Sequence, residues 1–276
     1  MIKIMVDSSS DCRKEDGFFD ICVPLTVSIG GKDYRSGVDL SADEFYELLT
    51  TSQEFPKTSQ PSPEAFAQEF EKIKEAGDEV ICLTLSSALS GTYQSAVIAK
   101  SMVDYEGIYI VDTLCVTHMI GILAKFAREQ IAAGVPAAQI AQQCEELKSK
   151  IKVLAGVDTL EYLYKGGRLS RASAAVGEIA GIKPIITITA EGTITTAGKA
   201  IGIPRAIQTI LTKLKSYEPD DRFPLYTLCT CGTENLEALE KKLAAAGFES
   251  AGRLQVGSTI GAHAGPGVYG VLFVTK

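Results

Sequence analysis

The sequence predicts an α/β protein in which an N-terminal domain with a parallel sheet, residues 1–157, is followed by an α+β domain, residues 158–276. Two observations predict this division. Between residues 80 and 151, apolar strand-like runs alternate with amphipathic helical stretches, which is typical of a parallel sheet with crossover helices. After residue 184, two β-branched runs flank a short turn and predict a hairpin instead.

The chain opens with an alternating strand that ends in a polar turn. Met1–Asp7 predicts the strand, and the run Asp7-Ser8-Ser9-Ser10-Asp11 follows at its carboxyl end, where parallel sheets place ligand-contacting groups. The same residues also favour a simple capping turn, so both interpretations stay open. Residues from about 12 to 55 predict a small inserted subdomain, because a hairpin with two glycines at its turn precedes a short helix with a capping box, Ser41 to Glu44.

A helix is predicted to begin at Ser62 and Pro63, with serine as the cap and proline at the first helical position, and to end at Gly77. Thr58 and Ser59 lie just before this helix and are expected in a loop. Polar residues are common in loops, so these two indicate a site only in combination with others.

The central feature is a buried strand that runs into the start of a helix. Val80–Leu85 has the length and composition of an interior strand, and Ser90-Gly91-Thr92 marks the turn into a helix expected over residues 92–100. Ser90 supplies the predicted N-cap hydroxyl. Because the first amides of a helix are unpaired, this turn could hold a carboxylate or a phosphate.

The remaining elements follow the same two patterns. The predicted segments are a strand at 108–111, helices at 116–133 and 137–151, a strand at 152–157, a short helix at 158–165, the hairpin at 184–197, helices at about 204–216 and 234–246, and strands at 225–231, 251–256 and 268–275. Gly166 and Gly167 end the short helix, and Arg168 follows them directly. His263 is predicted to lie in a loop, because glycines surround it.

Composition argues against several classes of partner. A net charge of −7 without a dense Lys/Arg cluster is unlike a nucleic-acid-binding protein. No apolar run approaches the ~20 residues of a membrane-spanning helix, so any membrane contact is expected to be transient and made from solution. The N-terminus lacks a signal-peptide pattern, and we expect a cytoplasmic protein. Seven cysteines without CxxC spacing predict reduced thiols, with Cys229 and Cys231 at alternate positions of a strand.

No motif for a cofactor or for covalent catalysis stands out. The chain lacks GxxxxGK[ST], GxGxxG and the GxSxG nucleophile elbow, and two histidines are too few for a metal site. His118 is interpreted as structural. A serine esterase with Ser90 as nucleophile and His263 as base stays an alternative. The other candidates form a group that can hold a carboxylate by hydrogen bonds: the hydroxyls of Thr58, Ser59 and Ser90, the amides near Gly91 and the imidazole of His263.

Five motifs spread over essentially the whole chain form a specific set. They are Asp7-Ser8-Ser9-Ser10-Asp11, Lys57-Thr58-Ser59-Gln60-Pro61-Ser62-Pro63, the run LSSALSGTYQSA from Leu85 to Ala96, Asp158-Thr159-Leu160-Glu161-Tyr162-Leu163 with Gly166-Gly167-Arg168, and Gly261-x-His263-x-Gly265-Pro266-Gly267. In this order they resemble the DegV family of bacterial fatty-acid-binding proteins.

The resemblance implies two α/β lobes with one long-chain fatty acid between them, no cofactor and no catalytic residue. It implies a carrier rather than an enzyme: a separate fatty acid kinase phosphorylates the bound carboxylate with ATP, and the acyl phosphate passes to phospholipid synthesis. By motif position, the carboxylate-binding group would comprise Thr58 and Ser90 in direct contact, Ser59 and Gly91 alongside, and His263 and Arg168 extending the network.

One segment departs from the family pattern. Lys199–Arg205 reads KAIGIPR where a basic Arg-Gly or Arg-Thr pair is expected, so a lipid sensor without a kinase partner is a further alternative.

Burial of a C16 chain at ~0.8 kcal/mol per CH₂ supplies on the order of 10 kcal/mol, against roughly 1–3 kcal/mol for each head-group hydrogen bond. The tail is therefore expected to set affinity, and the head group to set orientation.

Overall fold

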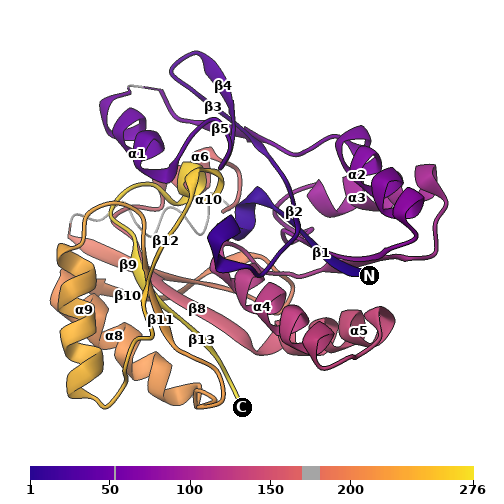
Figure 1. The fold of residues 1–276 in the computed structure, drawn as a ribbon. Coiled ribbons are helices and arrows are strands. Elements are labelled where there is room, and N and C mark those ends of the chain that lie inside the picture. The colour runs from indigo at the N-terminus through magenta and orange to yellow at the C-terminus, as the bar shows by residue number, and fades with distance from the viewer. Residues whose placement is uncertain (53, 170–180) are drawn as a thin grey trace.

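The chain folds into two α/β lobes, each built around its own sheet. The computed structural model describes residues 1–52, 54–169 and 181–276. Within these ranges the strands form a four-stranded, a six-stranded and a three-stranded sheet. Figure 1 shows the N-terminal lobe in indigo to magenta and the C-terminal lobe in orange to yellow, with the small sheet projecting from the N-terminal lobe. The predicted fold class is confirmed.

The four-stranded sheet is parallel throughout. Its strands, in spatial order, are β2 (Ile21–Val23), β1 (Ile2–Asp7), β6 (Glu79–Thr84) and β7 (Ile108–Asp112). Alternate residues of β6 face opposite sides, because side chains of a strand alternate: Val80 and Cys82 join one core cluster, whereas Ile81 and Leu83 join another. Both faces of this sheet are therefore buried.

Helices supply the cover on both faces. α2 (Pro63–Ala76) and α3 (Thr92–Val103) pack on the face of Val80 and Cys82, and α4 (His118–Ala132) and α5 (Ala137–Leu147) pack on the other. α2 has the predicted caps: Ser62 accepts a hydrogen bond from an amide of the first turn, and Gly77 takes a φ of 64° at the C-cap. α5 ends before the expected residue 151, because a 3-10 turn, η3 (Lys148–Lys150), follows it.

The inserted subdomain is a small antiparallel sheet with one helix. β3 (Thr26–Ile29) pairs with β4 (Lys32–Arg35) across a two-glycine turn and with β5 (Lys57–Ser59) on its other side. α1 (Ala42–Thr51) begins with the predicted capping box. The limits of about 12 and 55 need correction, since β2 already pairs in the main sheet and β5 lies beyond residue 55. Thr58 and Ser59 were expected in a loop. They lie in β5 instead, because this segment pairs with β3.

The six-stranded sheet forms the C-terminal lobe. Its order is β10 (Ile194–Ile201), β9 (Ile182–Ile188), β8 (Ile151–Gly156), β13 (Tyr269–Val274), β11 (Tyr226–Cys229) and β12 (Arg253–Gln255). β9 and β10 form the predicted hairpin, and β8 pairs antiparallel with β9 and β13. The pairing of β8 places the change of sheet before Ile151, whereas the sequence places the domain limit after residue 157.

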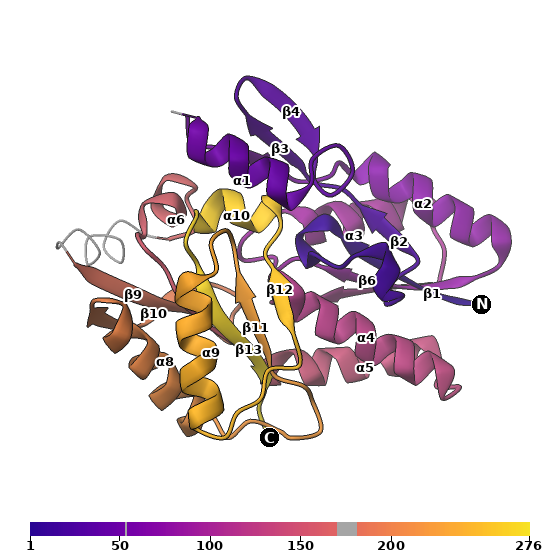
Figure 2. The same cartoon turned by 60° about the vertical axis from the view of Figure 1, so that its left-hand side comes forward.

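The two faces of the six-stranded sheet have different neighbours. α8 (Ile203–Ser216) and α9 (Glu234–Ala245) pack on one face in a cluster with Leu154 and Val271. On the other face, Val153 and Leu272 join the same core cluster as Ile120 and Leu123 of α4. A shared apolar core thus joins the two lobes, and α4 lies between their sheets (Figures 1 and 2).

Two short helices lie at the junction of the lobes and the insert. α6 (Glu161–Lys165) and α10 (Ser258–Ala264) contact each other, and α10 also contacts α1 and β5. Figure 2 shows α10 below α1 and beside α6. The prediction that His263 lies in a loop is wrong, because the glycines at 257 and 265 only flank this helix as its caps.

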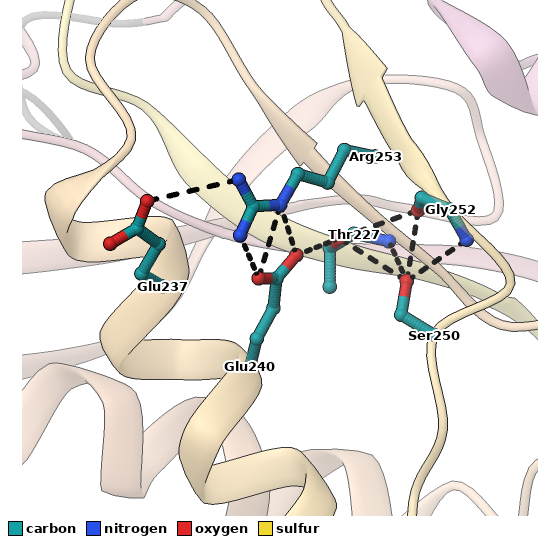
Figure 3. A network of polar contacts seen from close by, with 6 residues as sticks. All are labelled: Thr227, Glu237, Glu240, Ser250, Gly252 and Arg253. Carbon is teal, nitrogen blue, oxygen red and sulfur yellow. Dashed lines mark hydrogen bonds and ion pairs between the residues drawn. The ribbon is translucent and has the colours of Figure 1, made fainter.

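A polar network fixes the strand that leads into α10. The Arg253 guanidinium on β12 donates to both carboxylate oxygens of Glu240 on α9, with Nε to Oε1 at 2.9 Å and Nη2 to Oε2 at 2.5 Å (Figure 3). Thr227 donates its hydroxyl proton to the same carboxylate at 2.8 Å. These bonds lower the pKa of Glu240, and the bond from the Arg253 guanidinium makes the largest contribution. Together they hold the edge strand β12 against α9.

Candidate functional site

A narrow, mainly apolar cavity lies between the lobes, with an internal volume of about 80 Å³. Aliphatic side chains from both lobes form most of its wall. The lining residues are Leu25, Thr58, Leu85, Leu89, Ser90, Val116, Thr117, Val153, Ala155, Leu163, Arg168, Ile186, Thr187, Ile188, Ile194, Leu228, Val256, Thr259, Ile260, His263, Ala264 and Val268. Such a wall suits an apolar ligand held by a few polar groups.

The polar lining includes four of the residues singled out from the sequence: Thr58, Ser90, Arg168 and His263. Thr58 on β5 and His263 on α10 are directly hydrogen-bonded, with 2.7 Å between Oγ1 and Nε2. The other ring nitrogen of His263, Nδ1, is buried and has no hydrogen-bond partner among the residues that the structure describes. Two residues 205 positions apart in the sequence are thereby joined at the cavity wall.

Small residues allow the approach of this histidine. A Cβ on Gly166, at the end of α6, would lie 2.2 Å from His263 Nδ1. A Cβ on Gly261 would lie 2.4 Å from the hydroxyl of Tyr46, which donates a hydrogen bond of 2.8 Å to the carbonyl of Val256. The first glycine of the Gly-Gly-Arg motif and the glycine of the Gly-x-His motif are therefore needed for close packing around α10.

The electrostatics of the site keep the imidazole neutral at pH 7. Burial, and then the nearby positive charge of Arg168, lower the pKa of His263 to about 4. Arg168 donates from Nε to the Leu89 carbonyl at 3.0 Å and from Nη1 to the Gly166 carbonyl at 2.6 Å. Both acceptors are neutral, so these bonds orient the guanidinium but leave its charge available to an anion.

The turn before α3 differs from the prediction. The N-cap of α3 is Gly91 and makes no side-chain cap bond, so the assignment of Ser90 as the cap is wrong. The Ser90 hydroxyl lines the cavity and lies 2.9 Å from the hydroxyl of Thr92. Gly91 does not line the cavity, but a Cβ there would lie 2.1 Å from Oε1 of Gln60. Its role in the geometry is therefore to admit Gln60 against the start of the helix.

Ser59 is the other sequence candidate outside the cavity wall. It follows Thr58 in β5, and its side chain is exposed. Alternation along the strand explains this, because successive side chains point to opposite faces. Of the six candidates, the fold thus gathers four at the cavity and leaves Ser59 and Gly91 adjacent to it.

The arrangement lacks the contacts of a serine hydrolase. Ser90 is hydrogen-bonded to Thr92, and the Nε2 atom of His263 is hydrogen-bonded to Thr58. Within residues 1–52, 54–169 and 181–276, no carboxylate orients the imidazole, since Nδ1 has no partner there. A nucleophile, a base and an orienting acid must be joined in a chain of hydrogen bonds for that chemistry.

The polar turn after β1 serves the fold. Asp7 is fully buried and accepts hydrogen bonds from the amides of Ser9 and Leu85; burial raises the pKa of its carboxyl, while these bonds oppose that change. Asp11 accepts a bond of 2.6 Å from the hydroxyl of Thr117. Neither aspartate lines the cavity. Of the two interpretations left open, the geometry favours the structural one.

Three lining hydroxyls were missed from the sequence: Thr117, Thr187 and Thr259. Thr259 and His263 are four residues apart, a spacing that places both on one face of a helix. That signal was available but depended on recognising α10, which the many glycines concealed. Thr117 and Thr187 stand in apolar surroundings and gave no separate signal.

Other predicted properties concern metals, thiols and membranes. Across residues 1–52, 54–169 and 181–276, no group of three His, Cys, Asp or Glu side chains could hold a metal ion. All seven cysteines fall within these ranges, and each is a free thiol.

His118 hydrogen-bonds the carbonyl of Gln255 at 2.8 Å, which links α4 to β12 in accordance with a structural role. In the part of the chain that is described, no helix has the length and apolar character to cross a membrane.

The chain belongs to the DegV family: the family model, described as an uncharacterised protein of the DegV family, matches residues 1–276. A DegV domain-containing protein from Caldanaerobacter subterraneus subsp. tengcongensis is 38% identical over 283 residues, covering 100% of this chain and 99% of that protein. A second one, from Clostridium acetobutylicum, is 32% identical over 280 residues, with 100% and 99% covered.

Solved structures of similar fold carry more specific descriptions. A fatty-acid-binding DegV family protein from Thermus thermophilus has a TM-score of 0.88 and 30% identity, covering 100% of this chain and 99% of the other. A stearic-acid-binding protein from Eubacterium ventriosum has a TM-score of 0.90 and 29% identity, with the same coverage.

Proposed function

We propose that this chain is a cytoplasmic carrier that binds one long-chain fatty acid in the cavity between its lobes. It presents the carboxylate to a separate ATP-dependent fatty acid kinase and carries the acyl phosphate toward phospholipid synthesis. The observation that supports this most is an aliphatic cavity whose polar lining includes the bonded pair Thr58 and His263. Similar structures described as fatty-acid-binding proteins agree with this ligand.

The contacts support a proposed role for each head-group residue. Thr58 and Ser90 donate hydroxyl protons to the carboxylate, while His263 and Arg168 extend the network with a neutral ring and a positive charge. Ser59 and Gly91 flank the two donors, and their backbone helps to place those donors. The hydrogen bonds contribute a small share of the binding free energy, because each buried CH₂ group of the tail contributes about 0.8 kcal/mol.

In this proposal the protein itself performs no chemistry. An esterase using Ser90 and His263 would need a bond between them, and each has another partner. The esterase alternative predicts turnover of short acyl esters that disappears in Ser90→Ala, and the carrier predicts no turnover in either form.

Native mass spectrometry of the protein purified from a bacterial host tests the ligand. We expect a bound C14–C18 acid, whereas a reproducibly empty protein under mild conditions would contradict the proposal. The kinase step is tested separately, by acyl-phosphate formation with a fatty acid kinase. This second test is needed because the altered segment 199–205 exposes an apolar residue, Ile201, which is 64% exposed, where a basic pair is expected. A protein that retains the acid but binds no kinase would be a lipid sensor.

A further inference from the structure

One buried hydroxyl of the cavity wall has no hydrogen-bond partner in the described part of the chain. Thr259 on α10 is 2% exposed and lines the cavity, and its Oγ1 atom bonds to none of the described residues. An unpaired hydroxyl in an apolar wall is unfavourable, because it has lost its bonds to water. Such a group therefore points to a partner that a bound ligand supplies.

The local partners of Thr259 are engaged elsewhere. A threonine in a helix commonly donates to the carbonyl three or four residues earlier. The carbonyl of Val256, three residues earlier, accepts from the Tyr46 hydroxyl at 2.8 Å. The carbonyl of Gln255, four residues earlier, is hydrogen-bonded to Nε2 of His118 at 2.8 Å. Each of these carbonyls, which precede α10, already has one partner, and within the described residues the Thr259 hydroxyl bonds to neither of them.

We propose that Thr259 recognises an oxygen substituent near the carboxyl end of the acyl chain, so that the favoured ligand class is a hydroxylated long-chain fatty acid. This inference rests on the proposed function. Thr259 and His263 lie on one face of α10, four residues and therefore about 6 Å apart along its axis. In this proposal, a hydroxyl on C3 of an acid held at Thr58 and His263 forms a hydrogen bond with Thr259 Oγ1.

The surroundings of Thr259 favour this class over an unsubstituted acid. Its neighbours in the cavity wall along the chain, Val256 and Ile260, are apolar, and Thr117 already donates its hydroxyl proton to Asp11. A saturated unsubstituted chain therefore leaves the Thr259 hydroxyl unpaired. A 3-hydroxy acid pairs it and loses none of the tail contacts.

The test compares hexadecanoic acid with 3-hydroxyhexadecanoic acid on the delipidated full-length chain by calorimetry. We expect the wild type to prefer the hydroxy acid roughly three- to tenfold, as one net hydrogen bond allows. Thr259→Val, which keeps the shape, should abolish the preference without weakening hexadecanoic acid binding, and Thr259→Ser should retain it. Thr196→Val is the matched control, because Thr196 also has an unpaired hydroxyl but does not line the cavity.

The outcomes separate this inference from the proposal beneath it. Three outcomes would overturn the role of Thr259 while leaving fatty-acid binding in place. The wild type could bind both acids with equal affinity, the preference could survive in Thr259→Val, or Thr259→Val could lose the same affinity for both acids. Binding of neither acid by the wild type would refute the proposed function itself. Thermal unfolding of Thr259→Val should be no easier than that of the wild type, since the variant removes an unpaired buried hydroxyl.

Discussion

The four proposed head-group residues and the apolar body of the cavity come from different parts of the fold. The head-group residues belong to four separate segments: Thr58 on β5, Ser90 before α3, Arg168 after α6 and His263 on α10. Much of the apolar body belongs to one sheet, with Val153 on β8 and Ile186 on β9. The ligand's orientation and its affinity are therefore separable. Hydrogen bonds fix the carboxylate end, whereas burial of the apolar tail supplies most of the affinity.

The largest effect is expected from narrowing the apolar body. Val153→Phe adds bulk to the β8 wall and should exclude part of a long tail. If four methylene groups lose their burial, binding of hexadecanoic acid weakens by roughly 3 kcal/mol. Calorimetry with hexadecanoic and decanoic acids checks this, and the short acid should bind as well as it does to the wild type. An equal loss of affinity for both acids would show that the β8 wall does not discriminate between chain lengths.

A steric change at the polar groups should cost somewhat less. Gly166→Ala places a methyl group against His263 Nδ1 and should displace the ring from Thr58. Overpacking of this kind costs about 2 kcal/mol of stability. Gly167→Ala is the control, since it meets no atom within 4 Å and suffers only from its φ of 73°. Thermal unfolding and fatty-acid affinity are the readouts, and only Gly166→Ala should change the affinity.

Acidification should destabilise the protein through His263. Its pKa falls from 6.5 to about 4 on folding, so between these values the unfolded chain binds a proton that the folded protein does not. Asp11, raised from 3.8 to about 6 chiefly by burial, acts in the opposite direction. The His263→Gln variant separates the two groups. The difference in unfolding free energy between wild type and variant should fall by roughly 2–3 kcal/mol from pH 7 to pH 4. A difference that does not vary with pH would contradict the buried neutral ring.

The smallest effects belong to single head-group hydroxyls. Thr58→Ala and Ser90→Ala should each weaken binding by about 1 kcal/mol and lower acyl-phosphate formation further, because the carboxylate loses its orientation. Ser59→Ala, with its exposed side chain, should behave as the wild type in both assays. Binding titrations and a coupled kinase assay decide between them. Equal effects at all three positions would disprove the distinction between lining and flanking residues.

Local rules predicted much of the fold. The cap at Ser62, the stop at Gly77 and the alternation of β6 depend only on neighbouring residues, and each was readable from the sequence. α10 was not, because this short helix is stabilised by contacts of Gly261 and Tyr46 far apart in the chain. Four cavity residues could be named from motifs, but the apolar wall could not. Which aliphatic side chains face the cavity depends on the packing of two lobes.

A crystal structure of the protein with hexadecanoic acid tests the central claim most directly. The account predicts the carboxylate within hydrogen-bond distance of the Thr58 and Ser90 hydroxyls, with the tail along Val153 and Ile186. An acid bound outside this cavity, or bound with its carboxylate among the aliphatic side chains of β8 and β9, would contradict it.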